Sequence, residues 1–333
     1  MKIEEKRRYD RQFLLKDWDQ QKISRGRVFI AGMGAIGCPS AINLALMGMG
    51  TIIICDYDTI EISNLSRQLL FLEDDINQFK SKVAERKLKE LNPNINVISY
   101  NKKIEELDPE IFDTVNILID GLDNFEARRY LNSIAIDKKK PLIHAGTYGW
   151  YGNVQVVIPF KTACLQCQPL IPEKRLSKPC TPPGKIRKKE IIEEKEHFPS
   201  INTVSMILSS IQCQEALKIL LGIGKIMEDF LFYDSLSQSF TYMPLKKNKD
   251  CIICGEKRLK SNLFAVEKGE TINDVKKRLI VTFNLDNEIK LMLKGKILND
   301  NAIIEDNEVK NDDFLFIYSK NMPRPLKIQL KFS

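Results

Sequence analysis

The chain has 333 residues, of which 43% are hydrophobic and 29% are charged, and its formal net charge is +7. This length accommodates one large domain and one small one. There is no apolar run of about 18 residues, and the opening residues, MKIEEKRRYD, lack the apolar segment of a signal peptide. We therefore expect a cytoplasmic protein without a membrane partner, and the dispersed charge predicts no nucleic-acid partner.

The first motif is a glycine-rich turn between an apolar strand and a helix. Residues 27–37 read RVFIAGMGAIG, which spaces Gly32, Gly34 and Gly37 as Gly-x-Gly-x-x-Gly before the helical stretch PSAINLALMGMG. Such glycines permit a tight turn, and the amide groups that open the helix face phosphate oxygens. The next strand, TIIICDYD, brings Asp56 to its end, where a carboxylate binds ribose hydroxyls. Alone, this pattern is as typical of a nicotinamide-dependent dehydrogenase as of an ATP-binding enzyme.

Polar side chains are concentrated directly after that strand. The segment DYDTIEISNLSRQLLF leads through an acidic turn into the helix KSKVAERKLKEL. Beside the carboxylate of Asp56 it adds Asn64, Arg67, Gln68 and Lys80. Fixed cations stabilise the charge that develops when a triphosphate is cleaved, and a dehydrogenase does not need them. Together these residues favour ATP chemistry.

Asp123 follows a second apolar strand, in ILIDGLDNFEARRYL. Its carboxylate should project at the carboxyl end of the sheet, where doubly wound folds bind ligands. There it would hold an Mg2+ ion that bridges phosphates. The alternative is helix capping, because Asp123 precedes a helical run whose first amide groups need acceptors. The two roles are compatible.

Two Cys-x-x-Cys pairs, Cys164/Cys167 and Cys251/Cys254, lie far apart in the chain. This spacing is typical of a structural zinc site, in which each short turn supplies two of four thiolates. The alternative is two disulfides or idle thiols, which a reducing compartment disfavours. We predict a Zn2+ site that ties two distant segments together.

Cys180 lies between the pairs, in the turn-prone sequence PCTPPG. Basic residues flank it on both sides: Lys174, Arg175, Lys178, Lys185, Arg187, Lys188 and Lys189. A positive field lowers the pKa of a thiol, so Cys180 is the candidate nucleophile. The remaining cysteines, Cys38, Cys55 and Cys213, have apolar surroundings and are expected to be core residues. His144 and His197 suggest no cysteine–histidine pair, and we expect core or loop roles for both.

After the linker KRLKSN the sequence changes character. The segments LFAVEKG, NEIKLMLKGKIL, DDFLFIYSK and PLKIQLKFS are typical of strands, and TINDVKKRL is typical of a helix capped by Thr271. This order resembles a ubiquitin-like (β-grasp) fold. One interpretation is a fused modifier, but a modifier would end in Gly-Gly, whereas this sequence ends Leu330-Lys331-Phe332-Ser333.

These motifs together resemble the adenylating enzymes that activate ubiquitin-like proteins, a superfamily shared by ubiquitin-activating enzymes and bacterial sulfur-carrier adenylyltransferases. The matching stretches are RRYDRQ, the glycine turn, DYDTIEISNLSRQLLF, Lys80, GLDNFEARRYLN, ACLQC and CIICG. The resemblance implies an α/β fold: a doubly wound, mostly parallel Rossmann-like sheet, a zinc-bound subdomain and a small C-terminal ubiquitin-like domain. The expected domains are an ATP-binding adenylation domain (1–160), a part with the crossover loop, catalytic cysteine and zinc clip (161–258), and a ubiquitin-fold domain (262–333).

The same resemblance implies the site. The residues expected to bind ATP are Gly32, Gly34, Ala35, Gly37, Asp56, Asp58, Ser63, Asn64, Arg67, Gln68, Lys80, Asp123 and Asn124. Asp123 would also hold Mg2+, and Cys180 would form a thioester. Arg11 of one subunit would reach the ATP site of a second, so a homodimer is expected.

The predicted function is activation of a ubiquitin-like protein with a C-terminal Gly-Gly. ATP-dependent adenylation of that glycine would be followed by a thioester on Cys180 and transfer to a conjugating enzyme docked on residues 262–333. Only about twenty residues separate Cys180 from the helical stretch INTVSMILSSIQCQEALKILLG, which leaves no room for an inserted half-domain. A loop movement would therefore bring its thiol to the adenylate. One alternative is an adenylyltransferase for a sulfur carrier, with Cys180 in persulfide chemistry or dispensable. Another is a non-catalytic scaffold subunit, and a nicotinamide-dependent oxidoreductase is least favoured.

Overall fold

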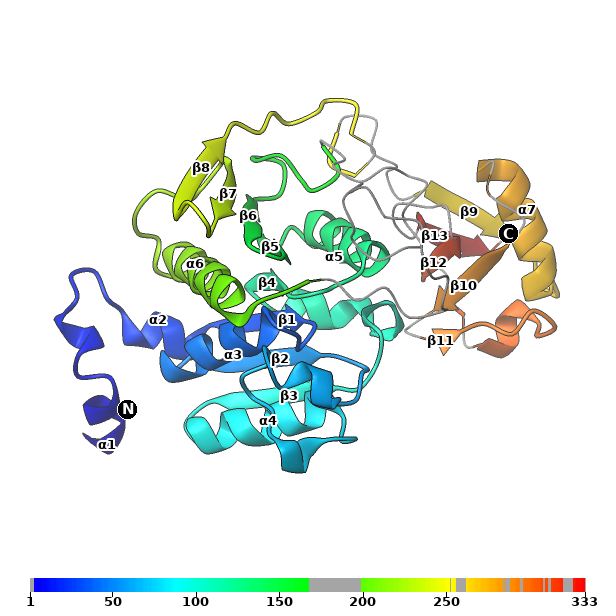
Figure 1. Ribbon diagram of the computed structural model, residues 1–333. Helices are drawn as coiled ribbons and strands as arrows, with labels where there is room; N and C mark the ends of the chain where they lie inside the picture. Colours follow the sequence, from blue (N-terminus) through cyan, green and yellow to red (C-terminus); the bar gives the residue numbers. More distant parts are fainter. Residues whose placement is uncertain are drawn as a thin grey trace, which may run out of the picture.

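The computed structural model describes residues 3–167, 199–251, 253–255, 262–283, 285, 288–293, 296–307, 309–310, 313–319 and 326–332. Cys180, the basic residues that flank it and His197 lie outside these residues. The described chain forms an eight-stranded sheet flanked by helices and, C-terminal to it, a smaller five-stranded sheet (Figure 1).

The larger sheet has the strand order β3-β2-β1-β4-β5-β6-β7-β8. Its parallel part contains β1 (Arg27–Ala31), β2 (Thr51–Cys55), β3 (Asn96–Tyr100), β4 (Ile117–Asp120) and β5 (Leu142–Tyr148). Antiparallel pairing then adds β6 (Tyr151–Val157), β7 (Phe230–Asp234) and β8 (Ser239–Met243). The strand order reverses between β1 and β4, which is where doubly wound sheets bind ligands. The predicted Rossmann-like, mostly parallel sheet is confirmed.

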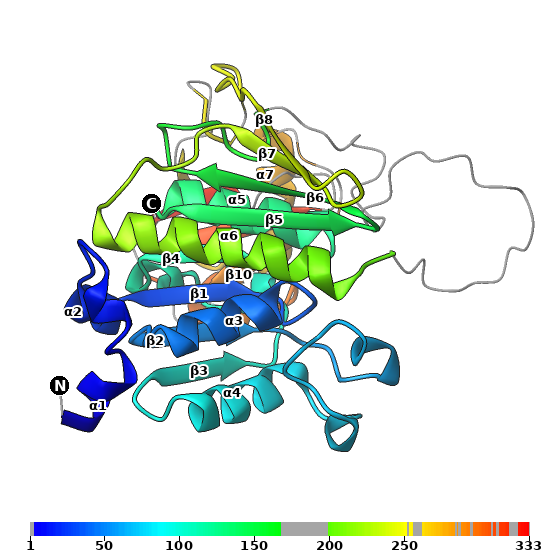
Figure 2. The same cartoon turned by 60° about the vertical axis from the view of Figure 1, so that its left-hand side comes forward.

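Helices cover both faces of this sheet. One face packs against α3 (Gly37–Leu46), α4 (Lys80–Leu91) and α6 (Asn202–Leu221), which lie in front in Figure 2, and the other against α5 (Phe125–Asp137). Within β1, Val28 and Ile30 belong to the first core, whereas Phe29 and Ala31 belong to the second. Because both faces are covered, the parallel strands are continuous apolar runs such as TIIIC in β2.

Short elements complete the larger unit. Two N-terminal helices, α1 (Ile3–Arg8) and α2 (Gln20–Arg25), lie beside the amino ends of β1 and β2 (Figure 2). The short 3-10 helices in this unit are η1 (Gln12–Leu14), η2 (Ile62–Asn64), η3 (Glu73–Asp75), η4 (Ile104–Glu106) and η5 (Pro109–Thr114). Among the described residues, α6 alone has the length and apolarity of a membrane span, and 56% of its apolar window is buried against the protein. That burial is typical of a core helix.

The C-terminal unit has its own core. Its strands are β9 (Asn262–Val266), β10 (Ile289–Leu293), β11 (Lys296–Ile297), β12 (Phe314–Ser319) and β13 (Leu326–Phe332), in the order β11-β10-β12-β13-β9. A helix, α7 (Ile272–Phe283), and a 3-10 turn, η7 (Ile304–Asn307), cover one face. Thr271 caps α7 as predicted, since its hydroxyl accepts the N–H of Asp274 at 3.2 Å. The last strand pairs in parallel with the first.

Candidate functional site

The glycine turn lies against the turn that follows β4. Gly32 has a φ of +84°, and a Cβ there would stand 2.7 Å from the carbonyl oxygen of Gly121. A Cβ on Gly37 would stand 1.9 Å from the carbonyl oxygen of Gly32. Neither position accepts a side chain, so the backbones of the two turns approach closely at the switch point of the sheet.

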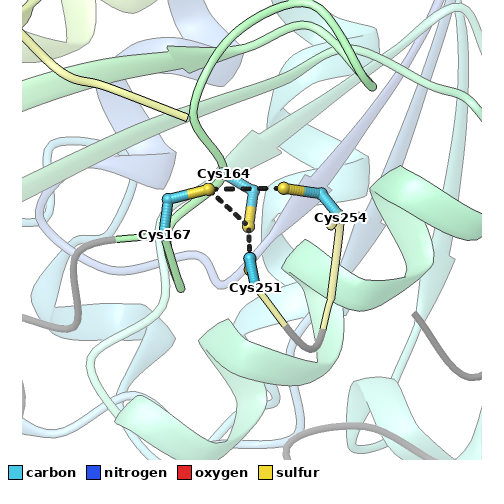
Figure 3. Close-up of side chains that lie close together, drawn as sticks. All are labelled: Cys164, Cys167, Cys251 and Cys254. Carbon is cyan, nitrogen blue, oxygen red and sulfur yellow. Dashed lines mark hydrogen bonds between the residues drawn. The ribbon is translucent and has the colours of Figure 1, made fainter. Parts of the chain in front are cut away.

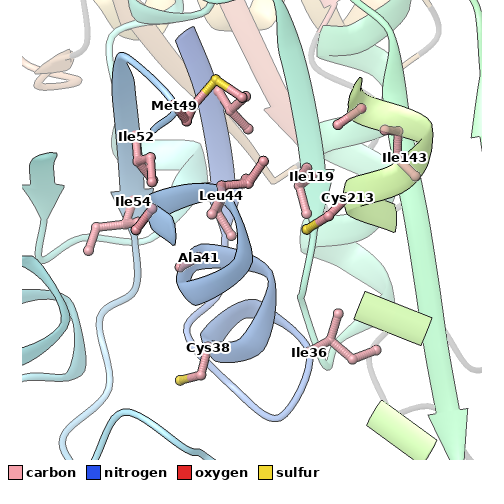
Figure 4. Close-up of a cluster of buried hydrophobic side chains, with 14 of the residues drawn as sticks. Ile36, Cys38, Ala41, Leu44, Met49, Ile52, Ile54, Ile119, Ile143 and Cys213 are labelled. Carbon is pink, nitrogen blue, oxygen red and sulfur yellow. The ribbon is translucent and has the colours of Figure 1, made fainter. Parts of the chain in front are cut away.

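The apolar core around the start of α3 contains two buried cysteines, Cys38 and Cys213. Figure 4 shows Cys38 at the first turn of α3, and Cys213 of α6 among the isoleucines of β4 and β5. Burial raises the pKa of Cys38 and of Cys213 to about 12, and Cys55 is buried as well. The three cysteines are core residues, as predicted, and are unsuited to nucleophilic chemistry.

Asp56 forms a hydrogen bond with the backbone of the glycine turn. One carboxylate oxygen accepts the N–H of Met33 at 2.7 Å, and the other accepts the N–H of Asp58 at 2.8 Å. Burial raises the pKa of Asp56, and the nearby charge of Lys80 opposes that rise. The structure thus shows a bond from Asp56 to the turn that the sequence did not predict.

Lys80, the first residue of α4, lies beside the carboxylates of Asp56 and Asp58. Its Nζ lies 2.9 Å from Asp58 Oδ2, and its side chain is only 8% exposed. Burial alone would lower the pKa of Lys80, but the charges of Asp56 and Asp58 outweigh it and raise the pKa. The side chain is therefore a desolvated, permanent cation, which interacts with a phosphate far more strongly than a surface lysine does.

The segment between β2 and α4 presents an unsatisfied acceptor. Gln68 is buried, and its Oε1 has no hydrogen-bond partner among the described residues. The Oδ1 of Asn64, also buried, accepts the N–H of Glu61 at 3.0 Å and holds the turn of η2. Arg67 is half-buried and donates to the carbonyl oxygen of Ser63 at 2.7 Å. A buried polar atom without a partner fits a site that a ligand completes.

Asn124, not Asp123, caps α5. The Oδ1 of Asn124 accepts the N–H of Ala127 at 2.8 Å, while Asp123 is exposed. The capping alternative for Asp123 is therefore wrong. Asp123 lies exposed in the turn that follows the carboxyl end of β4.

A buried cluster at the ends of β4 and β5 escaped the sequence analysis. Asp120 and His144 are opposite one another in the sheet, and Arg128 of α5 joins them. The expected core or loop role of His144 is confirmed as a core role, because its side chain is buried in β5, and the structure adds a bond from its Nδ1 to Asp120 at 2.7 Å. The only local signal was an aspartate at the last position of a buried strand.

The four paired cysteines meet in one buried cluster (Figure 3). All four Sγ atoms lie within 4.8 Å of one another, and the distances are 3.6 Å for Cys164–Cys251 and 3.3 Å for Cys167–Cys254. Tetrahedral zinc with Zn–S bonds of about 2.3 Å separates its sulfurs by about 3.8 Å. Disulfides need about 2.05 Å, so that alternative is wrong.

The N-terminal segment with Arg11 does not reach this site within its own chain. Arg11 lies between α1 and η1, and α1 and α2 flank the amino ends of the strands, opposite the glycine turn (Figure 2). A role for Arg11 in the ATP site therefore requires a second subunit.

Known proteins share this arrangement. The model of the ThiF family matches residues 9–253. The chain is 30% identical over 253 residues to the sulfur carrier protein ThiS adenylyltransferase of Escherichia coli (strain K12), covering 74% of this chain and 94% of that protein. It is 37% identical over 185 residues to ubiquitin-like modifier-activating enzyme 1 of Homo sapiens, covering 52% of this chain and 18% of that protein. The structure of E. coli MccB with ATP matches with a TM-score of 0.61 and 25% identity over 74% of each chain.

The matched residues, 9–253, cover most of the larger unit, including the glycine turn, Lys80 and three of the four paired cysteines, and the C-terminal unit lies beyond them. Nearly the whole of the bacterial adenylyltransferase is covered, but less than a fifth of the human enzyme. The chain therefore belongs to the ThiF family, within the E1-like superfamily of adenylating enzymes.

Proposed function

We propose that this protein activates a ubiquitin-like protein, using Cys180 as the thioester-forming nucleophile and residues 262–333 as a ubiquitin-fold domain that recruits a conjugating enzyme. The observation that supports adenylation is the buried cation of Lys80, ion-paired beside the glycine turn. The observation that favours an activating enzyme over a simple adenylyltransferase is the C-terminal unit with its separate core.

The reaction begins when the C-terminal glycine carboxylate of the modifier attacks the α-phosphate of ATP and pyrophosphate leaves. Lys80 and Arg67 offset the negative charge of the phosphates, together with Arg11 from the second subunit of a homodimer. Asp123 would hold Mg2+, which neutralises phosphate charge when bound. The thiolate of Cys180 then attacks the acyl carbon, AMP leaves, and the modifier is held as a thioester.

The C-terminal unit is placed beside the adenylating unit. Tyr318 of β12 packs against the second core, with its ring centroid 6.1 Å from that of Tyr130 on α5. Docking of this kind would hold a recruited conjugating enzyme near the site where the thioester forms. We place the protein in the cytoplasm.

Adenylation of a sulfur carrier is the second candidate, because a sulfur-carrier adenylyltransferase is covered over 94% of its length. In that case Cys180 would serve persulfide chemistry or be dispensable. A scaffold subunit is disfavoured because Lys80 and Asp58 form an intact ion pair at the glycine turn.

The first test asks whether Cys180 carries the modifier. The protein is incubated with ATP, Mg2+ and a panel of ubiquitin-like proteins and sulfur carriers that end in Gly-Gly, then separated on gels with and without reductant. We expect an ATP-dependent, reductant-sensitive adduct that Cys180→Ala abolishes, while ATP–pyrophosphate exchange stays within about twofold. Cys213→Ala, a substitution of a core cysteine, should retain the adduct.

Three outcomes would contradict this assignment. An adduct that survives Cys180→Ala would exclude Cys180 as the nucleophile. Pyrophosphate exchange without any adduct would favour the sulfur-carrier candidate. No exchange with any member of the panel would favour the scaffold.

A second test concerns the C-terminal unit. Deletion of residues 262–333 should preserve the thioester adduct but abolish its transfer to a conjugating enzyme, because the docking surface is removed. The adduct itself reports that the shortened chain is folded, which matters because the deletion uncovers Tyr130. Unimpaired transfer by the shortened chain would count against recruitment.

A further inference from the structure

The short turn between β4 and α5 decides where Asp123 points. Only residues 121–124 join the two elements. Gly121 is pressed against the glycine turn, and Asn124 is committed to capping the helix. The direction in which Asp123 points therefore depends on how the peptide groups of the preceding residue, Leu122, are held.

Asp120 holds the first of these peptide groups. This carboxylate is fully buried, and its Oδ1 accepts the N–H of Leu122 at 2.9 Å. Its Oδ2 accepts from Arg128 Nε at 2.9 Å and contacts His144 Nδ1 at 2.7 Å. A buried carboxylate with bonds of this kind has little rotational freedom.

Arg128 holds the second peptide group. While its Nε binds Asp120, its terminal Nη2 donates to the carbonyl oxygen of Leu122. The N–H and the C=O of Leu122 are therefore both bound by the two members of a single ion pair. The planar fork of a guanidinium makes this geometry possible, and the single ammonium of a lysine does not reproduce it.

The charges of the cluster are consistent with this bonding. Burial alone would raise the pKa of Asp120, but Arg128 and His144 outweigh it and lower the pKa. Burial and the charge of Arg128 lower the pKa of His144. Asp120 is thus ionised and His144 neutral near pH 7, so the imidazole carries its proton on Nδ1 and donates it to Asp120.

The cluster is also tied to the helix of the glycine turn. Gln212 of α6 donates to the carbonyl oxygens of Asp120 at 3.0 Å and Ile143 at 2.9 Å. Its Oε1 accepts from the hydroxyl of Ser40 on α3 at 3.0 Å. Buried hydrogen bonds therefore connect the two turns that face each other across the switch point.

We propose that Asp120 and Arg128 are positioning residues that aim the carboxylate of Asp123 at the Mg2+ bound with ATP. This inference rests on the proposed role of Asp123 in nucleotide binding. Neither residue needs to contact the nucleotide, because the ion pair acts through the peptide groups of Leu122. Their effect should therefore appear in the Mg2+ dependence of ATP binding and not in ATP binding alone.

The test measures the Kd for ATP by calorimetry on the full chain, with Mg2+ and with EDTA. Mg2+ should tighten ATP binding by the wild type, and Asp123→Asn should remove that enhancement. Asp120→Asn replaces one carboxylate oxygen by an NH2 donor, so the side chain cannot accept both from Leu122 N–H and from Arg128 and His144. This variant should reduce the enhancement by about 10-fold while leaving the Kd in EDTA within about twofold. Arg128→Lys keeps the charge on the pair but loses the fork, so it should reduce the enhancement as well.

Glu215→Gln is the matched control. Glu215 is also a buried carboxylate, with a backbone N–H donor, Met227, at 3.1 Å and a cationic partner, Lys218. This change from carboxylate to amide should lower stability without altering the effect of Mg2+, so it separates positioning from a general loss of folded protein.

The outcomes distinguish the inference from the function on which it rests. If the wild type does not bind ATP, or Asp123→Asn leaves the Mg2+ enhancement intact, the proposed role of Asp123 fails. If Asp123→Asn behaves as expected but Asp120→Asn and Arg128→Lys retain the enhancement as Glu215→Gln does, only the positioning role is overturned. If Asp120→Asn does not fold, Arg128→Lys alone decides.

Discussion

Lys80→Ala is expected to lower the rate of ATP–pyrophosphate exchange by about 100- to 1,000-fold. The side chain is 8% exposed and pairs with Asp58 at 2.9 Å, so its charge acts from a site with little water. A phosphate that replaces Asp58 as its partner would gain a strong, desolvated interaction, and alanine removes it. The measurement is the initial exchange rate at saturating ATP, with the modifier that gives the strongest wild-type signal.

Lys82→Ala is the matched control for this prediction. Lys82 lies on the same helix, but its side chain is 59% exposed, and its Nζ forms a long ion pair with Glu85 Oε2 at 3.7 Å. An exposed pair of this kind contributes little to stability, so this variant should keep the wild-type exchange rate. Equal exchange rates for Lys80→Ala and the wild type would remove Lys80 from the ATP site.

Cys251→Ser is expected to abolish zinc binding and to lower the Tm by more than about 10 °C, because a structural zinc site contributes directly to folding free energy. The wild type should contain about one zinc ion per chain. The cluster joins a turn after β6 to a turn after β8, and Leu165 in the first turn also donates to Asn132 of α5 at 3.1 Å. Metal analysis of the purified protein and a thermal melt measure the two effects.

Cys213→Ala controls for the loss of a buried cysteine. Cys213 is 2% exposed and lies in the apolar core, outside the cluster of four sulfurs. Its replacement leaves a small cavity and should cost about 1 kcal/mol without any change in zinc content. Full zinc content in Cys251→Ser, or equal Tm values for the two variants, would exclude a structural zinc site.

The sequence determined those features that depend on local spacing. Gly32 and Gly37 occupy positions of a turn that accept no side chain, and the apolar runs before and after it fix the alternation of buried strands and helices. The Cys-x-x-Cys spacing likewise predicts paired ligands from single turns. These patterns need no knowledge of the tertiary fold, because the residues that interact are neighbours in the chain.

Choices between adjacent residues were harder. Asp123 and Asn124 are both good helix caps, and sequence reasoning considered only Asp123. The backbone decides, because Asn124 has the extended conformation of a cap, with φ of −119° and ψ of 150°. The same turn packs against Gly32 through Gly121, a contact that no local pattern encodes.

The tertiary structure alone decided the contacts between distant segments. Asp120, Arg128 and His144 come from β4, α5 and β5, and they meet because parallel pairing aligns the two strands while α5 folds back over them. The bond from Asp56 to Met33 and the meeting of the two cysteine pairs depend in the same way on the closing of the sheet. A sequence specifies which residues can form hydrogen bonds and ion pairs, but burial and strand register select the partners. The reason is that an unpaired charge buried in this core would cost too much free energy.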